Sequence, residues 1–148
     1  MRKIMLALAV ILTVGLTSAF ANNSEDINRI AIASFKNDFS QATQVSWQEG
    51  KDYVKATFTL NDQVMFAYYS KESNELMAVE RNILTDQLPI NLYTSLKKDY
   101  RSEWISGLFE MAKPDHTVYF ATLENADERI VLKSNGSSEW VMYKREKK

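Results

Sequence analysis

Apolar and polar residues alternate along residues 52–60 and 63–70, which are separated only by Asn61-Asp62. Alternation with a period of two is the pattern of a half-buried β-strand, and a short polar connection is typical of a hairpin turn. The apolar residues of the first stretch share one face of an extended chain: Val54, Ala56, Phe58 and Leu60. We therefore predict a β-hairpin that forms the centre of the fold.

The second stretch of this hairpin carries apolar residues on both faces. One face holds Val64, Phe66 and Tyr68, which we expect to point into the core. The other face keeps Met65 and Tyr69, where an antiparallel sheet with one solvated side usually shows polar residues. We predict that these two side chains point outward with Tyr53.

Two helical patterns and six more strand-like runs surround the hairpin. The first helix is predicted after Ser24, a suitable N-cap, and the second after Asp86 and Pro89. Apolar residues recur at helical spacing in both, namely Ile27, Ile30, Ala31, Phe35 and Phe39 in the first and Leu92, Leu96 and Tyr100 in the second. Strands are predicted at residues 44–48, 75–83, 104–111, 117–123, 128–133 and 139–144.

The predicted order of helix, four strands, helix and four strands suggests an internal duplication. Asn37-Asp38-Phe39 resembles Lys98-Asp99-Tyr100, and Thr59-Leu60 recurs as Thr122-Leu123. We predict an α+β fold, a tandem repeat of helix plus four-stranded antiparallel sheet with the helices packed on one face. The two pseudo-repeats would cover about residues 24–84 and 85–146 of a single domain at residues 22–148.

The first 21 residues have the features of a secretory signal peptide. Arg2 and Lys3 precede an apolar run that ends before Ala19-Phe20-Ala21, a small-x-small cleavage pattern. The run is shorter than the roughly 20 apolar residues of a membrane-spanning helix. We expect a periplasmic or secreted protein at residues 22–148, with no membrane span after cleavage.

Charge and cysteine content narrow the classes of partner. Of the 18 basic residues, Arg2 and Lys3 lie in the signal peptide. The other 16 stand against 19 acidic residues, which gives a net charge of about −3. There is no basic surplus of the kind that binds nucleic acid, so no nucleic-acid partner is expected. The chain has no cysteine, which fits a bacterial envelope protein better than a disulfide-dense extracellular scaffold.

Several of these features together resemble a known family. They are the signal peptide, Val45-Ser46-Trp47 after the first helix, the hairpin over residues 53–70 and Leu88-Pro89 before the second helix. The chain is similar to the secreted bacterial PepSY-like proteins, also described as beta-lactamase-inhibitor-like. The resemblance implies an exported helix-plus-antiparallel-sheet protein, and an inhibitor of this architecture grips its enzyme with the concave face of its sheets. The paired cysteines of that inhibitor are absent, and no inhibitory loop can be matched.

The sequence offers no catalytic constellation, metal site or cofactor motif. His116 is the single histidine, follows Pro114-Asp115 in a predicted turn, and has no cysteine or second histidine to share a zinc ion. No nucleophile-elbow pattern is present, since Ser106-Gly107 is only a dipeptide. We therefore predict that the protein is not an enzyme.

The aromatic and basic residues of the predicted outward face are the remaining candidates for function. This face is expected to hold Tyr53, Met65 and Tyr69 in the first half and Arg129 and Lys133 in the second. Tyrosine and arginine are enriched at protein-binding hot spots. We predict a non-catalytic protein-binding module, an inhibitor of or adaptor for another envelope or secreted protein. The alternative is a periplasmic small-ligand or envelope-stress carrier, with a pocket between helices and sheet.

Overall fold

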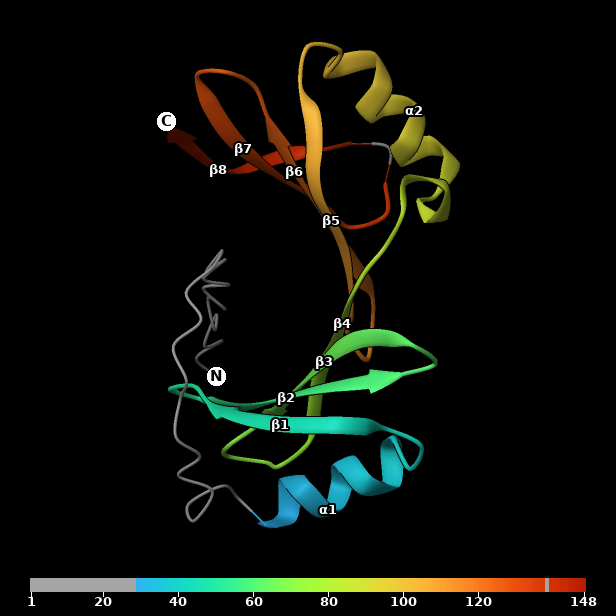
Figure 1. The fold of residues 1–148 in the computed structure, drawn as a ribbon, viewed down its shortest axis with the longest axis vertical. Helices are drawn as coiled ribbons and strands as arrows, with labels where there is room; N and C mark the ends of the chain where they lie inside the picture. The colour runs from blue at the N-terminus through green and yellow to red at the C-terminus, as the bar shows by residue number, and fades with distance from the viewer. Residues whose placement is uncertain (1–28, 138) are drawn as a thin grey trace, which may run out of the picture.

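The computed structural model describes residues 29–137 and 139–148 (Figure 1). The predicted signal peptide at residues 1–21 and Ile27 of the predicted first helix lie outside these residues. In order along the chain, the elements are α1 (Arg29–Asp38), β1 (Thr43–Glu49), β2 (Tyr53–Leu60), β3 (Gln63–Ser70), β4 (Leu76–Asn82), the short 3₁₀ helix η1 (Thr85–Gln87), α2 (Ile90–Asp99), β5 (Trp104–Ala112), β6 (Thr117–Glu124), β7 (Glu128–Ser134) and β8 (Val141–Lys147).

In the described part of the chain, eight strands form one antiparallel sheet in sequence order, from β1 to β8. The predicted tandem repeat of helix plus four-stranded antiparallel sheet is therefore wrong. β4 pairs with β5, with Val79 opposite Ala112 and Asn82 opposite Phe109. Two separate sheets would each leave an unpaired edge at this point, whereas the pairing satisfies the backbone N–H and C=O groups of both strands.

The strand registers place both helices on the same face of this sheet. Side chains directly opposite each other across strands, or two residues apart along a strand, share a face. Ala67 on β3 lies opposite Val79 on β4, and Val79 lies opposite Ala112 on β5. Ala112 is on the same side of β5 as Leu108, so Ala67 and Leu108 share a face. Ala67 belongs to the core beneath α1 and Leu108 to the core beneath α2. The helices cover opposite ends of one face (Figure 1).

The turn between β2 and β3 fixes which residues of this hairpin reach that helix-covered face. Asn61 and Asp62 have positive φ angles of 50° and 61°, as a two-residue turn that matches the twist of its strands requires. Leu60 consequently lies opposite Gln63, and Phe58 opposite Met65. The side of β3 that carries Met65 therefore faces α1.

An aromatic cluster holds α1 on the sheet. The ring of Phe35 lies 5.0 Å from that of Phe58 and 5.3 Å from that of Trp47, centre to centre. Tyr69 is fully buried beside it, and its hydroxyl donates a 3.0 Å hydrogen bond to Asp38 Oδ2 at the end of α1. Burial of each such aromatic side chain contributes about 2–3 kcal/mol, which a helix of this length needs from its packing.

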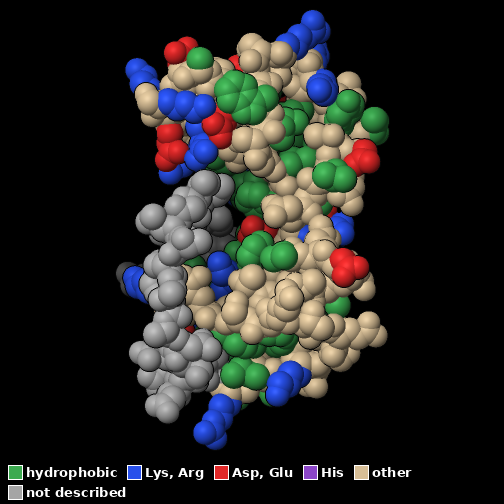
Figure 2. All heavy atoms as spheres, viewed as in Figure 1, with side chains coloured by type: hydrophobic (Ala, Val, Ile, Leu, Met, Phe, Trp, Pro, Cys, Tyr) green, Lys and Arg blue, Asp and Glu red, His purple; other side chains and the backbone are tan. Residues whose placement is uncertain are grey.

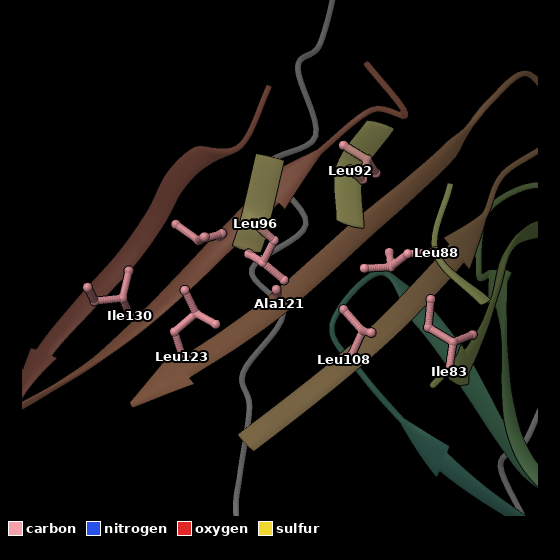
Figure 3. Packing of buried hydrophobic residues seen from close by; sticks show 9 residues of the cluster. Ile83, Leu88, Leu92, Leu96, Leu108, Ala121, Leu123 and Ile130 are labelled. Atoms are coloured by element: carbon pink, nitrogen blue, oxygen red, sulfur yellow. The ribbon is translucent and has the colours of Figure 1, made fainter. Parts of the chain in front are cut away.

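An aliphatic cluster does the same for α2 (Figure 3). Leu92 and Leu96 point from the helix to the sheet, where side chains of β5, β6 and β7 meet them. The indole Nε1–H of Trp140 donates a 3.1 Å hydrogen bond to the carbonyl oxygen of Leu92. This bond ties the segment before β8 to the helix.

The two outer strands are exposed along almost their whole length. The side chains of β8 are all exposed, and those of β1 are exposed except for Trp47. Ion pairs connect β8 within itself and to β7, through Lys144–Glu146 and Arg145–Glu128. Figure 2 shows basic and acidic side chains next to one another at this end of the molecule, at the upper left. Charged residues on an edge strand disfavour pairing with another chain.

Candidate functional site

The face of the sheet opposite the helices is the candidate site, and we call it the helix-free face. The strand registers assign to it, among others, Tyr53, Lys55, Phe66, Tyr68, Glu80, Phe109, Phe120, Arg129, Val131 and Lys133. Its apolar residues form two clusters, one around Tyr68 and Met111 and one around Phe120 and Val131. The face therefore combines an apolar floor with charged side chains.

Two lysines on this face lie over aromatic rings of neighbouring strands. Lys55 Nζ is 5.3 Å from the centre of the Phe66 ring. Lys133 Nζ is 5.9 Å from the centre of the Phe120 ring and 6.0 Å from that of Tyr143. These distances fall within the range of cation–π attraction, so each ammonium group has a defined position above the floor.

A tyrosine and a carboxylate form a partly buried pair between the two lysines. Tyr68 on β3 donates a 2.8 Å hydrogen bond to Glu80 Oε2 on β4. Burial raises the pKa of Glu80, although the hydrogen bond from Tyr68 and the charge of Lys55 oppose that effect. Burial also raises the pKa of the Tyr68 phenol, so this group stays protonated and keeps donating.

At the β8 end of the face, Glu124 collects three donors. Arg129 reaches Glu124 Oε1 through Nε at 3.0 Å and Nη2 at 2.9 Å, and Lys148 Nζ reaches Oε2 at 2.8 Å. Hydrogen bonds from Lys148, Ser106 and Arg129, in that order, lower the pKa of Glu124 to about 2. Arg129 is thus committed to a structural ion pair.

The structure places three of the five residues predicted to form the site on one face of the sheet. Tyr53, Arg129 and Lys133 lie on the helix-free face, and the ring of Tyr53 is 5.6 Å from that of Tyr68. The expectation that Met65 and Tyr69 point outward is wrong. Met65 packs on the core beneath α1, and Tyr69 has an exposed fraction of 0%.

The register of the β2–β3 hairpin explains this misplacement. A two-residue turn at Asn61-Asp62 places Val54 opposite Tyr69, so both must share the helix-covered face. The sequence predicts this turn, and the turn fixes the register of the second strand. That register places Phe66 and Tyr68 on the helix-free face, where Tyr68 is buried as predicted, with an exposed fraction of 8%.

The remaining titratable residues show no catalytic arrangement in the part of the chain that the structure describes. His116 is exposed in the turn between β5 and β6, where its Nδ1 lies 2.7 Å from Asp115 Oδ1. The hydrogen bond with His116 lowers the pKa of Asp115. Within residues 29–137 and 139–148, no group of three or more His, Cys, Asp or Glu residues is placed to hold a metal ion.

Comparisons with known proteins identify the fold. No family model matches the sequence, and no curated protein matches it. A candidate periplasmic protein from Bacteroides eggerthii has a similar structure, with a TM-score of 0.72 and 10% identity over 81% of this chain and 88% of that chain. A DUF2874 family protein from Bacteroides uniformis gives a TM-score of 0.72 and 13% identity over 81% and 88%.

A third solved structure bears on the resemblance drawn from the sequence. A BLIP-like protein from Bacteroides fragilis superposes with a TM-score of 0.68 and 13% identity over 81% of this chain and 85% of that chain. The fold is therefore BLIP-like, whereas the PepSY-like part of the resemblance stays a prediction. Among the described residues, no helix has the length and apolar character to span a membrane.

Proposed function

We propose that the protein is a non-catalytic, exported protein-binding module, and that it acts as an inhibitor or adaptor by docking a partner protein on its helix-free face. The observation that carries this proposal is the composition of that face. Aromatic side chains gather there beneath two positioned lysines, and aromatic residues are enriched at the centres of protein interfaces. Tyr143 and Val141 extend the face with exposed fractions of 42% and 64%.

The likeness of fold supports the proposal in two ways. The B. fragilis neighbour is BLIP-like, which agrees with the inhibitor-like resemblance of the sequence. The B. eggerthii neighbour is a candidate periplasmic protein, which agrees with the predicted signal peptide and with a periplasmic or secreted location. The helices occupy only one side of the sheet, so a partner would approach from the other.

The alternative of a small-ligand carrier has no comparable support. The space between α2 and the sheet is filled by leucine and isoleucine side chains, and Leu92 and Leu132 have exposed fractions of 0%. Two hollows of about 500 and 550 Å³ flank Ile83 and Leu84 beside the β4–α2 connection. Both are open to solvent instead of being enclosed between helix and sheet, as a carrier pocket would be.

Photo-crosslinking in cells that export the protein tests the docking face. p-Benzoyl-phenylalanine is placed at Tyr143 on the helix-free face or, in the matched control, at exposed Ala33 on α1. We expect a discrete adduct from position 143 alone. The partner captured in that adduct, once identified and purified by itself, should bind the wild-type chain. Equal adducts from both positions, or none from position 143, would contradict the proposal.

A further inference from the structure

The helix-free face carries the same arrangement twice, once towards each end. On β2, Lys55 lies directly opposite Tyr68 and over the ring of Phe66. On β7, Lys133 lies directly opposite Phe120 and over its ring. In both places a lysine on one strand rests on aromatic side chains of the next. A side chain held in this way loses less conformational freedom when it binds a second group.

These two lysines differ from the other cations of the face in their partners. Arg129 is paired with Glu124, and Lys144 is paired with Glu146. Neither Lys55 nor Lys133 has a carboxylate within ion-pair distance among residues 29–137 and 139–148. Glu80, an acidic group of this face whose pKa the charge of Lys55 lowers, is hydrogen-bonded to Tyr68. The face therefore presents two positioned ammonium groups whose charge is not neutralised by a direct contact.

Resting on the proposed function, we infer that the partner docks through an acidic segment whose carboxylates meet Lys55 and Lys133. The two lysines are five strands apart, which is about 24 Å across the sheet at roughly 4.8 Å per strand. The row of residues that contains Lys133 meets β2 at Thr59, four residues or about 13 Å along the strand from Lys55, so the separation measured along the sheet is about 27 Å. An extended chain of about eight residues covers that distance at roughly 3.3 Å per residue. Apolar side chains of the segment between its acidic ends would contact the partly exposed ring of Phe66, whereas the rings of Phe109 and Phe120 are buried.

A synthetic probe tests this inference without a natural partner. The probe is a fluorescein-labelled peptide with two Glu pairs separated by about eight residues of apolar and neutral character, the span derived above. In its matched control every Glu is replaced by Gln. We expect fluorescence anisotropy to show binding of the acidic probe only, and the affinity should fall as NaCl is raised because the contact is electrostatic.

Variants of the protein assign the binding to the two lysines. Lys55→Met and Lys133→Met keep an unbranched stem over each ring and remove the charge. Each should weaken binding of the acidic probe about threefold to fivefold, as expected for one partly exposed ion pair. The double variant should bind the acidic and Gln probes equally. Lys97→Met, on the exposed side of α2, serves as the matched control and should bind like the wild type.

The possible results separate this inference from the function on which it rests. Wild-type protein that binds both probes equally, or a double variant that keeps the preference for the acidic probe, would overturn the acidic partner. If crosslinking from position 143 nevertheless gives a partner adduct, the docking face stands and its partner is recognised by other chemistry. If the probe experiment succeeds, the adduct from position 143 should also disappear in the Lys55→Met/Lys133→Met background.

Discussion

Tyr68 and Glu80 form a 2.8 Å hydrogen bond between adjacent strands near the middle of the helix-free face. Phe66 lies opposite Glu80 on β3 and Met111 lies opposite it on β5, so the carboxylate is set among apolar side chains. Its removal from water raises its pKa, and the phenol of Tyr68 only partly compensates for the lost hydration. Burial of the Glu80 carboxylate therefore costs some folding free energy, which the hydrogen bond from Tyr68 offsets only in part.

We predict that Glu80→Gln changes the dependence of stability on pH. Because the folded-state pKa of Glu80 is raised above its usual value of 4.5, folding favours the protonated carboxyl. Wild-type stability should therefore decrease as the pH rises from about 4.5 through the folded-state pKa. The amide of Gln still accepts a hydrogen bond from Tyr68 but does not titrate. Urea unfolding between about pH 4 and 8 should show the variant gaining on the wild type as pH rises.

The result that would contradict this prediction is an equal pH dependence in the two proteins. Tyr68→Phe gives an independent check, because it removes the donor that opposes the rise in the pKa of Glu80. The folded-state pKa of Glu80 should then be higher than in the wild type, and NMR titration of the side-chain carboxyl carbon measures it directly.

Glu124 is predicted to have the opposite effect on stability. Its folded-state pKa is lowered to about 2, so its stabilising contribution is complete above its usual value of 4.5 and is lost as the pH falls towards 2. Glu124→Gln should lower stability at neutral pH and reduce the acid-induced loss. Glu72→Gln, at an exposed turn position, is the matched control. Acid unfolding followed by circular dichroism compares them, and equal acid sensitivity in both variants would refute the role of Glu124.

The local pattern of the sequence predicts most of the elements of this fold. The predicted strands at residues 63–70 and 117–123 agree closely with β3, Gln63–Ser70, and β6, Thr117–Glu124. Leu92 and Leu96 line α2 as expected from their spacing. These predictions depend on periodicity and turn residues within short stretches, and both can be read from the sequence directly.

The joining of the elements could not be predicted in the same way. The pairing of β4 with β5 spans the whole of η1 and α2, and no local pattern indicates that Arg81 will form an ion pair with Glu110. The predicted face of β3 was wrong for a different reason. That strand is apolar on both sides, so alternation alone does not distinguish Phe66 and Tyr68 from Met65 and Tyr69. The division into pseudo-repeats stays a prediction.

We predict that Tyr69 contributes more through its ring than through its hydroxyl. Tyr69→Phe loses only the hydrogen bond to Asp38 and should cost about 0.5–1.5 kcal/mol of unfolding free energy. Tyr69→Ala also empties a fully buried site between Phe35 and Trp47 and should cost about 3–5 kcal/mol. Urea unfolding at neutral pH gives both values.

A comparison with Tyr53 shows whether burial is the cause. Tyr53 is half-buried on the helix-free face, and Tyr53→Ala should cost clearly less than Tyr69→Ala. If the two alanine variants are equally destabilised, Tyr69 is not enclosed in solution as the structure has it. The same two variants distinguish stability from binding, because only Tyr53 is placed to affect binding of a partner to the helix-free face.

The continuous sheet predicts that both ends of the molecule unfold together. Trp47 lies in the cluster beneath α1 and Trp140 packs against the cluster beneath α2, so each reports on one end. Leu92→Ala should remove about 2–5 kcal/mol from the packing of α2. Because β4 and β5 join the ends through backbone pairing, a two-state transition should carry this loss to Trp47 as well.

Two single-tryptophan backgrounds make this measurement. Trp104 and Trp140 are replaced by Phe in one, and Trp47 and Trp104 in the other, and urea unfolding is followed by fluorescence with and without Leu92→Ala. We expect the decrease in unfolding free energy to be the same for both probes. A decrease that is seen by Trp140 but not by Trp47 would mean that the two ends unfold independently, as two separate four-stranded sheets would. Equal decreases would mean that the two ends unfold as one cooperative unit, so that Lys55 and Lys133 are held on one continuous sheet.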